Sequence, residues 1–303
     1  MKISVRPATP RDVELVSRLT RDAVEAGAGF GPFDPGQETT AELGAQLTAG
    51  AGLLAFAADR PLGVVRQWPD ATHPSRLGWV GKLAATKQPR QGEVTAALLA
   101  AAADRGARAG RTALRAVVSR ADSAGRQNLE AQGWQVLQPN GEWLTYGLPL
   151  ARSVPDAAAM HRLGRALSRL LRAGDLVVLA GSLGAGKTTL AQGIGAGLSV
   201  QGRITSPTFV LAREHAGRLP LVHVDAYRLG SLAELDDLDL DTTMLEAVTL
   251  VEWGDGLVES LTDGHLLVHL RRSQDSVDER RWVVLRATGP AWTGRQDQLD
   301  TQV

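Results

Sequence analysis

The feature that most constrains this chain is a buried strand followed by a glycine-rich loop and a helix. Residues 176–180 read Leu-Val-Val-Leu-Ala, an apolar run typical of a strand covered on both faces of a parallel sheet. The next eight residues, Gly181-Ser-Leu-Gly-Ala-Gly-Lys-Thr188, match the pattern G-x-x-x-x-G-K-[ST] in full. The sequence from Thr189 continues with helical character. This order predicts a loop that binds phosphate groups.

Each residue type in the loop has a chemical reason to be there. Glycines let backbone N–H groups converge on phosphate oxygens, and the N-terminus of the following helix favours negative charge. Lys187 is predicted to reach the β- and γ-phosphates, and the Thr188 hydroxyl to bind Mg²⁺. The chain has only four lysines, at positions 2, 82, 87 and 187. The only lysine of the second half therefore occupies the position where phosphate binding needs one.

A nucleotide site of this kind also needs a carboxylate at the end of a neighbouring strand to hold the metal. Two apolar runs end in an acid: Leu221-Val-His-Val-Asp225 and Thr249-Leu-Val-Glu252. Either acid could be a solvated charge at a strand end. The complete phosphate loop favours a functional role for both.

The composition of the chain excludes several classes of protein function. The 33 basic residues balance 33 acidic ones, which disfavours a protein that holds nucleic acid through a general electrostatic field. The absence of cysteine excludes disulfides, thiolate catalysis and thiolate metal centres. No uncharged apolar run approaches the length of a membrane span, and the first residues carry charges unlike those of a secretory signal. We therefore expect a soluble cytoplasmic protein without a membrane partner.

A length of 303 residues suits two domains, and the two-proline stretch at 147–155 is the expected boundary. We predict domains at residues 1–150 and 151–303. The fold class is predicted as α/β, with an N-terminal α+β domain followed by a domain with a mixed, mainly parallel sheet flanked by helices. The patterning predicts a long Ala/Leu helix over 94–109 and an amphipathic helix over 156–172. Strands are expected at 3–5, 53–57, 63–65, 79–84, 112–119, 134–137, 142–146, 176–180, 208–213, 221–224, 249–251, 266–270 and 282–287.

Four motifs in series carry a resemblance to a known family. They are Leu183–Thr189, Ser206-Pro-Thr-Phe209, His223-Val-Asp-Ala-Tyr-Arg-Leu229 and Val251-Glu-Trp253. In this order and spacing they resemble the TsaE family, the ATPase subunit of the bacterial machinery that makes tRNA N6-threonylcarbamoyladenosine. The resemblance covers about residues 153–290. It implies a P-loop NTPase fold, weak Mg²⁺-dependent ATPase activity and ATP and Mg²⁺ as cofactors.

The resemblance also implies partners and site residues. The partners would be threonylcarbamoyl transferase subunits of the TsaB and TsaD type, with tRNA reached only through the complex. Lys187, Asp225 and Glu252 would be catalytic, with Thr188, Glu252 and Asp225 near the metal and Asp225 positioning water. Ser206–Phe209 would sense the γ-phosphate. The residues expected around the nucleotide are Gly181, Leu183, Gly184, Ala185, Gly186, Lys187, Thr188, Thr189, Ser206, Thr208 and Trp253.

Some positions depart from that pattern or stay open. Met160 stands where the family usually has a threonine near the adenine, and either Arg280 or Arg281 matches a late family arginine. The six histidines are expected to have structural roles only. His265 and His269 are four residues apart in a strand, a spacing that forms no compact metal face.

The first half resembles the GNAT N-acetyltransferases in Ile3–Asp12, in the segment 83–99 and in Leu129-Glu-Ala-Gln-Gly-Trp134. In that family an R-x-x-G-x-G loop cradles acetyl-CoA. Here the register is Arg90-Gln-Gly-Glu-Val-Thr95, so Glu93 and Thr95 replace both glycines, and Leu129 stands where a tyrosine acid is common. We therefore expect an accessory domain that binds acetyl-CoA poorly or not at all. The alternatives are an active N-acetyltransferase regulated by nucleotide and a P-loop small-molecule kinase.

Overall fold

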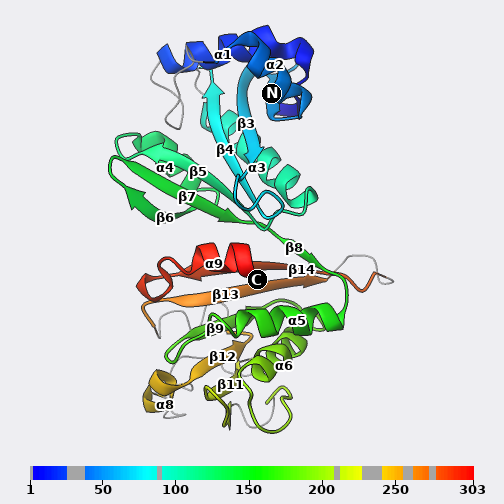
Figure 1. Cartoon of the computed structure of the whole chain (residues 1–303), viewed down its shortest axis with the longest axis vertical. Helices are drawn as coiled ribbons and strands as arrows, with labels where there is room; N and C mark the ends of the chain where they lie inside the picture. The colour runs from blue at the N-terminus through cyan, green and yellow to red at the C-terminus, as the bar shows by residue number, and fades with distance from the viewer. Residues whose placement is uncertain are drawn as a thin grey trace. The chain divides into compact units, whose positions relative to one another are not determined.

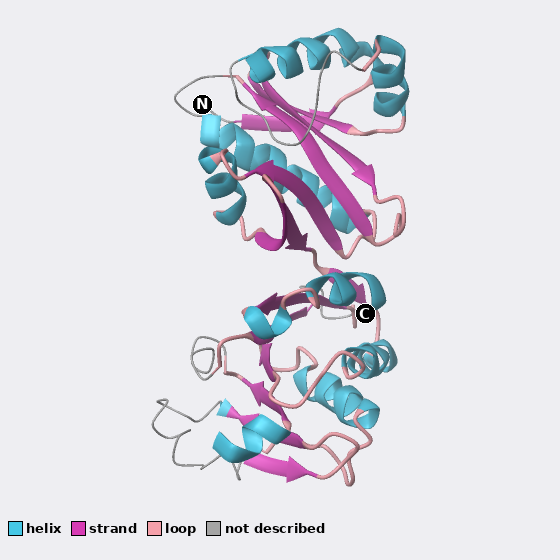
Figure 2. Cartoon of the chain, turned by 60° about the vertical axis from the view of Figure 1, so that its left-hand side comes forward, coloured by secondary structure: helices cyan, strands magenta, loops and turns pink. Residues whose placement is uncertain are grey.

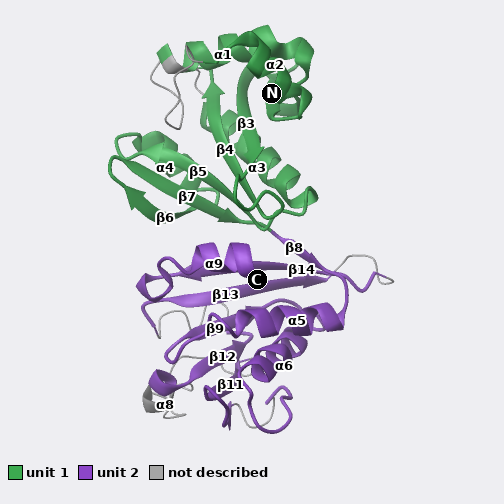
Figure 3. Ribbon diagram, in the orientation of Figure 1, with its two compact units in different colours: residues 1–150 green, residues 151–303 purple. Residues whose placement is uncertain are grey.

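Figure 1 shows the chain as a computed structural model. The structure describes residues 3–25, 38–86, 91–207, 212–226, 241–254, 262–272 and 278–303. Contacts divide the chain into two compact units, residues 1–150 and residues 151–303 (Figure 3). Each unit has its own sheet and its own core.

The first unit is built on a seven-stranded sheet in the order β1-β2-β3-β4-β5-β7-β6. Strands β4 and β5 pair in parallel, and the other neighbours are antiparallel. The strands are β1 (Ile3–Pro7), β2 (Gly52–Ala57), β3 (Arg60–Pro69), β4 (Leu77–Ala85), β5 (Ala113–Ser119), β6 (Gln135–Asn140) and β7 (Trp143–Pro149).

Helices cover both faces of this sheet (Figure 2). Helix α3 (Gln91–Arg108) and helix α4 (Ser123–Glu130) pack with the larger core, where Leu98, Leu99 and Leu129 are buried. On the other face, α1 (Val13–Glu25) and α2 (Thr40–Thr48) bury a second apolar cluster, and a short 3-10 turn at Pro10–Asp12 precedes α1. The unit therefore has three layers, with the sheet in the middle.

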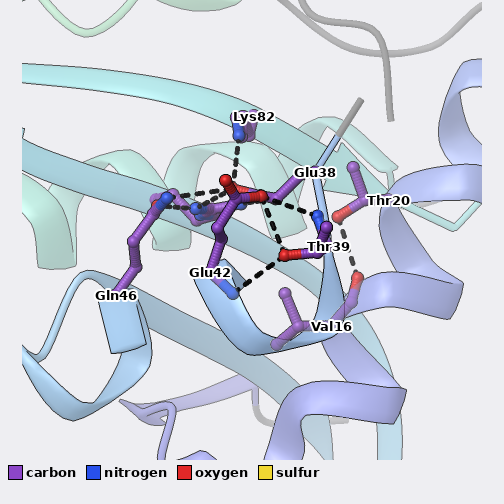
Figure 4. Close-up of polar contacts among 8 residues, drawn as sticks. Val16, Thr20, Glu38, Thr39, Glu42, Gln46 and Lys82 are labelled. Carbon is purple, nitrogen blue, oxygen red and sulfur yellow. Dashed lines mark hydrogen bonds and ion pairs between the residues drawn. The ribbon is translucent and has the colours of Figure 1, made fainter. Parts of the chain in front are cut away.

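Helix α2 was not expected from periodicity, although its start carries a clear local signal. Thr39 and Glu42 form a capping box, in which each side chain accepts a hydrogen bond from the other's backbone N–H, at 3.2 and 2.8 Å. Just before this cap, the Glu38 carboxylate accepts hydrogen bonds from the buried Arg66 guanidinium and from the Lys82 ammonium, at 2.8 and 2.9 Å (Figure 4). These contacts fix the start of α2 against β3 and β4.

The second unit also has a seven-stranded sheet, in the order β10-β11-β12-β9-β13-β14-β8. Its four central strands, β11, β12, β9 and β13, run parallel, and the outer neighbours are antiparallel. The predicted α/β class with a mixed sheet is confirmed. The strands are β8 (Arg152–Val154), β9 (Leu176–Ala180), β10 (Ala212–His215), β11 (Leu221–Asp225), β12 (Val248–Glu252), β13 (His265–Arg272) and β14 (Arg281–Thr288).

Two strands differ from the sequence expectation. Residues 152–154 belong to the expected domain boundary at 147–155, but they form the edge strand β8, with Val154 opposite Arg281 of β14. Three residues are too few to show alternation, and the partner strand lies more than a hundred residues away. The expected strand at 208–213 begins at Ala212 in the described part of the chain, and residues 208–211 lie outside it.

Helices α5 (Ala157–Leu167) and α6 (Lys187–Gly197) lie side by side (Figure 1) and share their core with one sheet face. Their approach depends on glycine. A Cβ atom on Gly164 would lie 2.6 Å from the Ile194 backbone nitrogen, and one on Gly193 would lie 2.5 Å from the His161 carbonyl oxygen. This close packing fixes the axis of α6, and therefore the loop before it. The remaining helices are α8 (Asp241–Glu246), a 3-10 turn at Pro290–Trp292 and α9 (Gln296–Gln302).

A buried ion pair fastens the C-terminal segment to this unit. The Arg295 guanidinium donates to both carboxylate oxygens of Asp175, at 2.8 and 2.6 Å, and both side chains are buried. Arg295 also donates to the Leu170 carbonyl and stacks on the Trp292 ring, 3.8 Å from its centroid. None of the helices described in the structure is long and apolar enough to cross a membrane.

Candidate nucleotide-binding site

A cleft of about 710 Å³ opens beside the loop that joins β9 to α6. Its walls come from the start of α5, the loop itself, the ends of β11 and β12, and the start of β14. The residues that line it are Asp156, Ala157, Met160, Leu183, Gly184, Ala185, Gly186, Lys187, Thr188, Thr189, Ser206, Asp225, Glu252, Trp253, Glu279 and Arg281. Most of the residues predicted around the nucleotide are in this set.

The loop has the backbone conformation that its glycines predict. Gly181, Gly184 and Gly186 have φ values of 140°, 72° and 102°, a region that L side chains rarely adopt. A Cβ atom on Gly181 would lie 2.3 Å from the Leu270 carbonyl oxygen, so no other residue fits there. Gly186 is the N-cap of α6, and the helix N-terminus therefore faces the cleft. Gly181 packs against the Leu270 carbonyl and is not part of the cleft lining.

Lys187 is folded back onto its own loop. Its ammonium donates hydrogen bonds to the carbonyl oxygens of Gly181 and Ser182, at 2.8 and 3.2 Å. It also lies 3.5 Å from the centroid of the Trp253 ring, a cation–π contact, and Trp253 has φ 65°. Burial lowers the pKa of the Lys187 ammonium, and the carboxylates of Glu252 and Asp225 oppose this shift. The lysine is thus held at the cleft by contacts that phosphate oxygens, as stronger acceptors for an ammonium, could replace.

The two carboxylates meet because β11 and β12 are parallel and in register. Asp225 is the register partner of Glu252, so both side chains leave the carboxyl ends of adjacent strands, and both are buried. The Thr188 hydroxyl lies 3.1 and 3.2 Å from the two Glu252 carboxylate oxygens. Ser206 donates a hydrogen bond to Asp225 at 2.6 Å. Residues from four separate motifs therefore converge on one point.

The donor set suits Mg²⁺ bound together with a nucleotide. Mg²⁺ prefers hard oxygen ligands, usually takes only one or two carboxylates from a protein, and keeps waters and phosphate oxygens as its other ligands. Thr188 and Glu252 supply such oxygens side by side, with Asp225 next to them. No group of three or more His, Cys, Asp or Glu side chains able to hold a metal occurs among the described residues. With Thr188 and Glu252 as ligands, the other positions of a bound Mg²⁺ would be open to water and phosphate oxygens.

The two late arginines lie in different surroundings. Arg281 lines the cleft, whereas the exposed Arg280 pairs with Asp278 at 2.9 Å. Asp156 caps α5 by accepting a hydrogen bond from the Ala159 N–H at 2.6 Å, and Met160 is buried. The sequence missed Asp156 and Glu279 as lining residues. Thr208, which was predicted to contact the nucleotide, lies outside the described residues.

In the first unit, the segment aligned with the acetyl-CoA loop forms the first turn of α3. Glu93 is exposed there, whereas Thr95 is buried beneath the helix. Thr95 therefore presents no exposed side chain on this turn. Leu129 is also fully buried. Arg90 lies outside the described residues.

A buried parallel strand, a glycine-rich loop with a lysine at the start of a helix, and a threonine beside a strand-end carboxylate define a P-loop nucleotide-binding protein. The sequence model described as "Threonylcarbamoyl adenosine biosynthesis protein TsaE" matches residues 154–282. A relative from Streptomyces coelicolor, named a tRNA threonylcarbamoyladenosine biosynthesis protein TsaE, is 54% identical over 138 residues. The match covers 44% of this chain and 93% of that protein. The chain belongs to the TsaE family.

Further similar proteins match either the second half or the first half of the chain. A protein of the same name from Mycobacterium tuberculosis H37Rv is 55% identical over 134 residues, 41% of this chain and 80% of that protein. The crystal structure of Bacillus subtilis YdiB is 27% identical, with a TM-score of 0.40, and covers 50% of this chain and 93% of its own. A GNAT acetyltransferase from Streptococcus pneumoniae, a structural neighbour of the N-terminal half, is 20% identical with a TM-score of 0.41. It covers 49% of this chain and 99% of its own.

Proposed function

We propose that the second unit binds ATP with Mg²⁺ and hydrolyses it slowly to support the formation of N6-threonylcarbamoyladenosine in tRNA. The observation that carries this proposal is the convergence of Lys187, Thr188, Asp225 and Glu252 on one cleft. Family membership supplies the pathway, since the relatives carry its name. The partners would be transferase subunits of the TsaB and TsaD type, and tRNA would be reached only through them.

Each residue has a role that its position allows. Thr188 and Glu252 would hold Mg²⁺, which neutralises charge on the phosphate oxygens when bound. Lys187 would leave the carbonyls of its own loop to bind the β- and γ-phosphates. Asp225 would orient the attacking water, and its hydrogen bond from Ser206 would link that water to the γ-phosphate-sensing segment. These residues offer positioning and charge neutralisation, and phosphoryl transfer needs little else.

We expect Glu252→Ala and Asp225→Ala to preserve the fold and to reduce ATP turnover by about 100-fold each, because each variant removes an oxygen that positions metal or water. Turnover would be measured with the partner subunits present, and folding by circular dichroism. Glu214→Ala is the matched control, because Glu214 is an exposed carboxylate of β10 outside the cleft. Wild-type turnover in both cleft variants would remove these strand ends from the site.

The pathway assignment has its own test. Threonylcarbamoyladenosine formation on unmodified tRNA would be reconstituted with the transferase subunits, with and without this chain. We expect multiple-turnover product only when both the chain and ATP are present. Product formation that is independent of the chain would separate the cleft from this pathway, whatever its nucleotide chemistry.

For the first unit we propose an accessory role without acetyl-CoA binding. A pyrophosphate cradle needs inward N–H groups and close backbone approach, and Glu93 places a negative charge on the turn that would form it. We expect no binding of acetyl-CoA tighter than about 100 μM by calorimetry. Because acetyl-CoA contains an adenine nucleotide, the titration would use the Lys187→Ala chain.

A second titration would use Glu93→Gly in the Lys187→Ala chain. If the missing glycine and the added charge prevent acetyl-CoA binding, this variant should gain measurable affinity for acetyl-CoA. Micromolar binding by the chain that retains Glu93 would contradict the prediction and favour a nucleotide-regulated acetyltransferase.

A further inference from the structure

A buried histidine stands directly behind the metal-binding carboxylate. His223 lies on β11, two residues before Asp225, and its side chain is fully buried. Its Nε2 atom is 3.0 Å from Oε1 of Glu252. His223 is not among the residues that line the cleft, and within the described ranges its side-chain contact with the site is the one to Glu252.

The contact between His223 and Glu252 has one direction. A carboxylate that holds a metal accepts hydrogen bonds, so Nε2 donates to Oε1 of Glu252. Nδ1 is buried with no hydrogen-bond partner in the described part of the chain. The contact with Glu252 is therefore the hydrogen bond that the described residues give this ring.

Glu252 is thereby held between two elements. His223 of β11 donates to Oε1 from one side, and the Thr188 hydroxyl at the start of α6 lies within hydrogen-bonding distance of both oxygens. A glutamate has three side-chain torsions, and each must be fixed for the carboxylate to stay beside Thr188. The Thr188 contact must change if that hydroxyl turns to a metal, whereas the His223 contact lies behind the carboxylate and can persist.

We infer that His223 is a positioning residue that holds Glu252 in the orientation needed to bind Mg²⁺ with Thr188. This inference rests on the proposed function and adds a residue to it. Groups that orient a metal ligand typically change metal affinity or activity by about 10–100-fold when they are removed. The expected defect is therefore in Mg²⁺ binding, and nucleotide binding without metal should be unaffected.

The test measures the Mg²⁺ concentration that half-maximally enhances binding of a fluorescent ATP analogue to the full chain. In His223→Phe, which fills the space without a donor, we expect this concentration to rise by about 10–100-fold. Affinity for the analogue in EDTA should stay at the wild-type value. His223→Gln retains an N–H donor and should recover part of the loss.

The matched control is His215→Phe. His215 is a buried histidine on the neighbouring strand β10, and it forms no ion pair with a carboxylate within the described ranges. It should leave the Mg²⁺ dependence unchanged. Equal Mg²⁺ dependence in His223→Phe and the wild type would overturn the inference. So would equal defects in His223→Phe and His215→Phe, since these would report general destabilisation of the sheet.

A spectroscopic measurement separates this inference from the proposed function. In the nucleotide-free chain labelled with ¹⁵N-histidine, His223 should show a slowly exchanging Nε2 proton, because Glu252 accepts its hydrogen bond. Glu252→Ala should abolish that protection. An Nε2 proton that exchanges freely in the unmutated chain overturns the inference even if ATP binds. If the wild type shows no Mg²⁺-dependent nucleotide binding, the proposed function fails and so does the role inferred for His223, whatever the spectrum shows.

Discussion

Lys187→Ala is expected to abolish detectable ATP hydrolysis, a loss of at least about 100-fold, while the chain stays folded. The lysine is the cationic side chain that the cleft places at the phosphate loop, and groups that stabilise charge in the transition state are typically worth 10²–10³ in rate. Its present contacts, two carbonyl oxygens and the Trp253 ring, contribute little to the fold. The measurement is steady-state phosphate release with the partner subunits present.

Lys82→Ala is the control for this loss. Lys82 belongs to the first unit, where it pairs with Glu38, and it is also one of the four lysines. Its removal should leave hydrolysis at the wild-type rate. Unchanged hydrolysis in Lys187→Ala would show that the loop does not bind the transferred phosphate, and the assignment of the cleft would fail.

The second large effect concerns stability. Asp175→Ala should lower the free energy of unfolding of the second unit by about 3–5 kcal/mol, because it leaves the Arg295 guanidinium buried without its counter-charge. The loss would be measured by urea denaturation, with the first unit followed separately because two units need not unfold together.

Two further variants show whether an uncompensated charge is the cause. Asp175→Leu combined with Arg295→Met replaces the pair by apolar groups and should cost clearly less than Asp175→Ala. Asp278→Ala removes the partner of the exposed Arg280 and should leave the denaturation midpoint unchanged. If Asp175→Ala and the apolar double variant are equally destabilised, lost packing and not stranded charge would be responsible.

The sequence predicts those parts of the site that are formed by consecutive residues. The phosphate loop needs glycines, a lysine and a threonine at fixed spacing between a strand and a helix, so residues Gly181–Thr188 are enough to predict its conformation. The acids at 225 and 252 were predictable for a related reason: each ends an apolar strand, and parallel strands bring their carboxyl ends to one edge.

What the sequence could not predict depends on pairings between distant segments. His223 faces Glu252 only because β11 lies in register beside β12, and Asp175 meets Arg295 across 120 residues. A histidine or aspartate alone carries no sign of such a partner. Strand β8 could not be predicted for the same reason, because it pairs with the distant strand β14. Helix α2 is a different case, because the capping box at Thr39 and Glu42 was a readable signal that its weak periodicity obscured.

The role proposed for the second unit depends on the binding of ATP together with Mg²⁺ in the cleft between α5, α6 and the strand ends. Calorimetric titration of the full chain with ATP, in the presence and absence of Mg²⁺, measures this binding. We expect one nucleotide per chain, tighter binding with Mg²⁺, and loss of both effects in Lys187→Ala. Absence of binding at millimolar ATP, or binding that Lys187→Ala leaves intact, would contradict it.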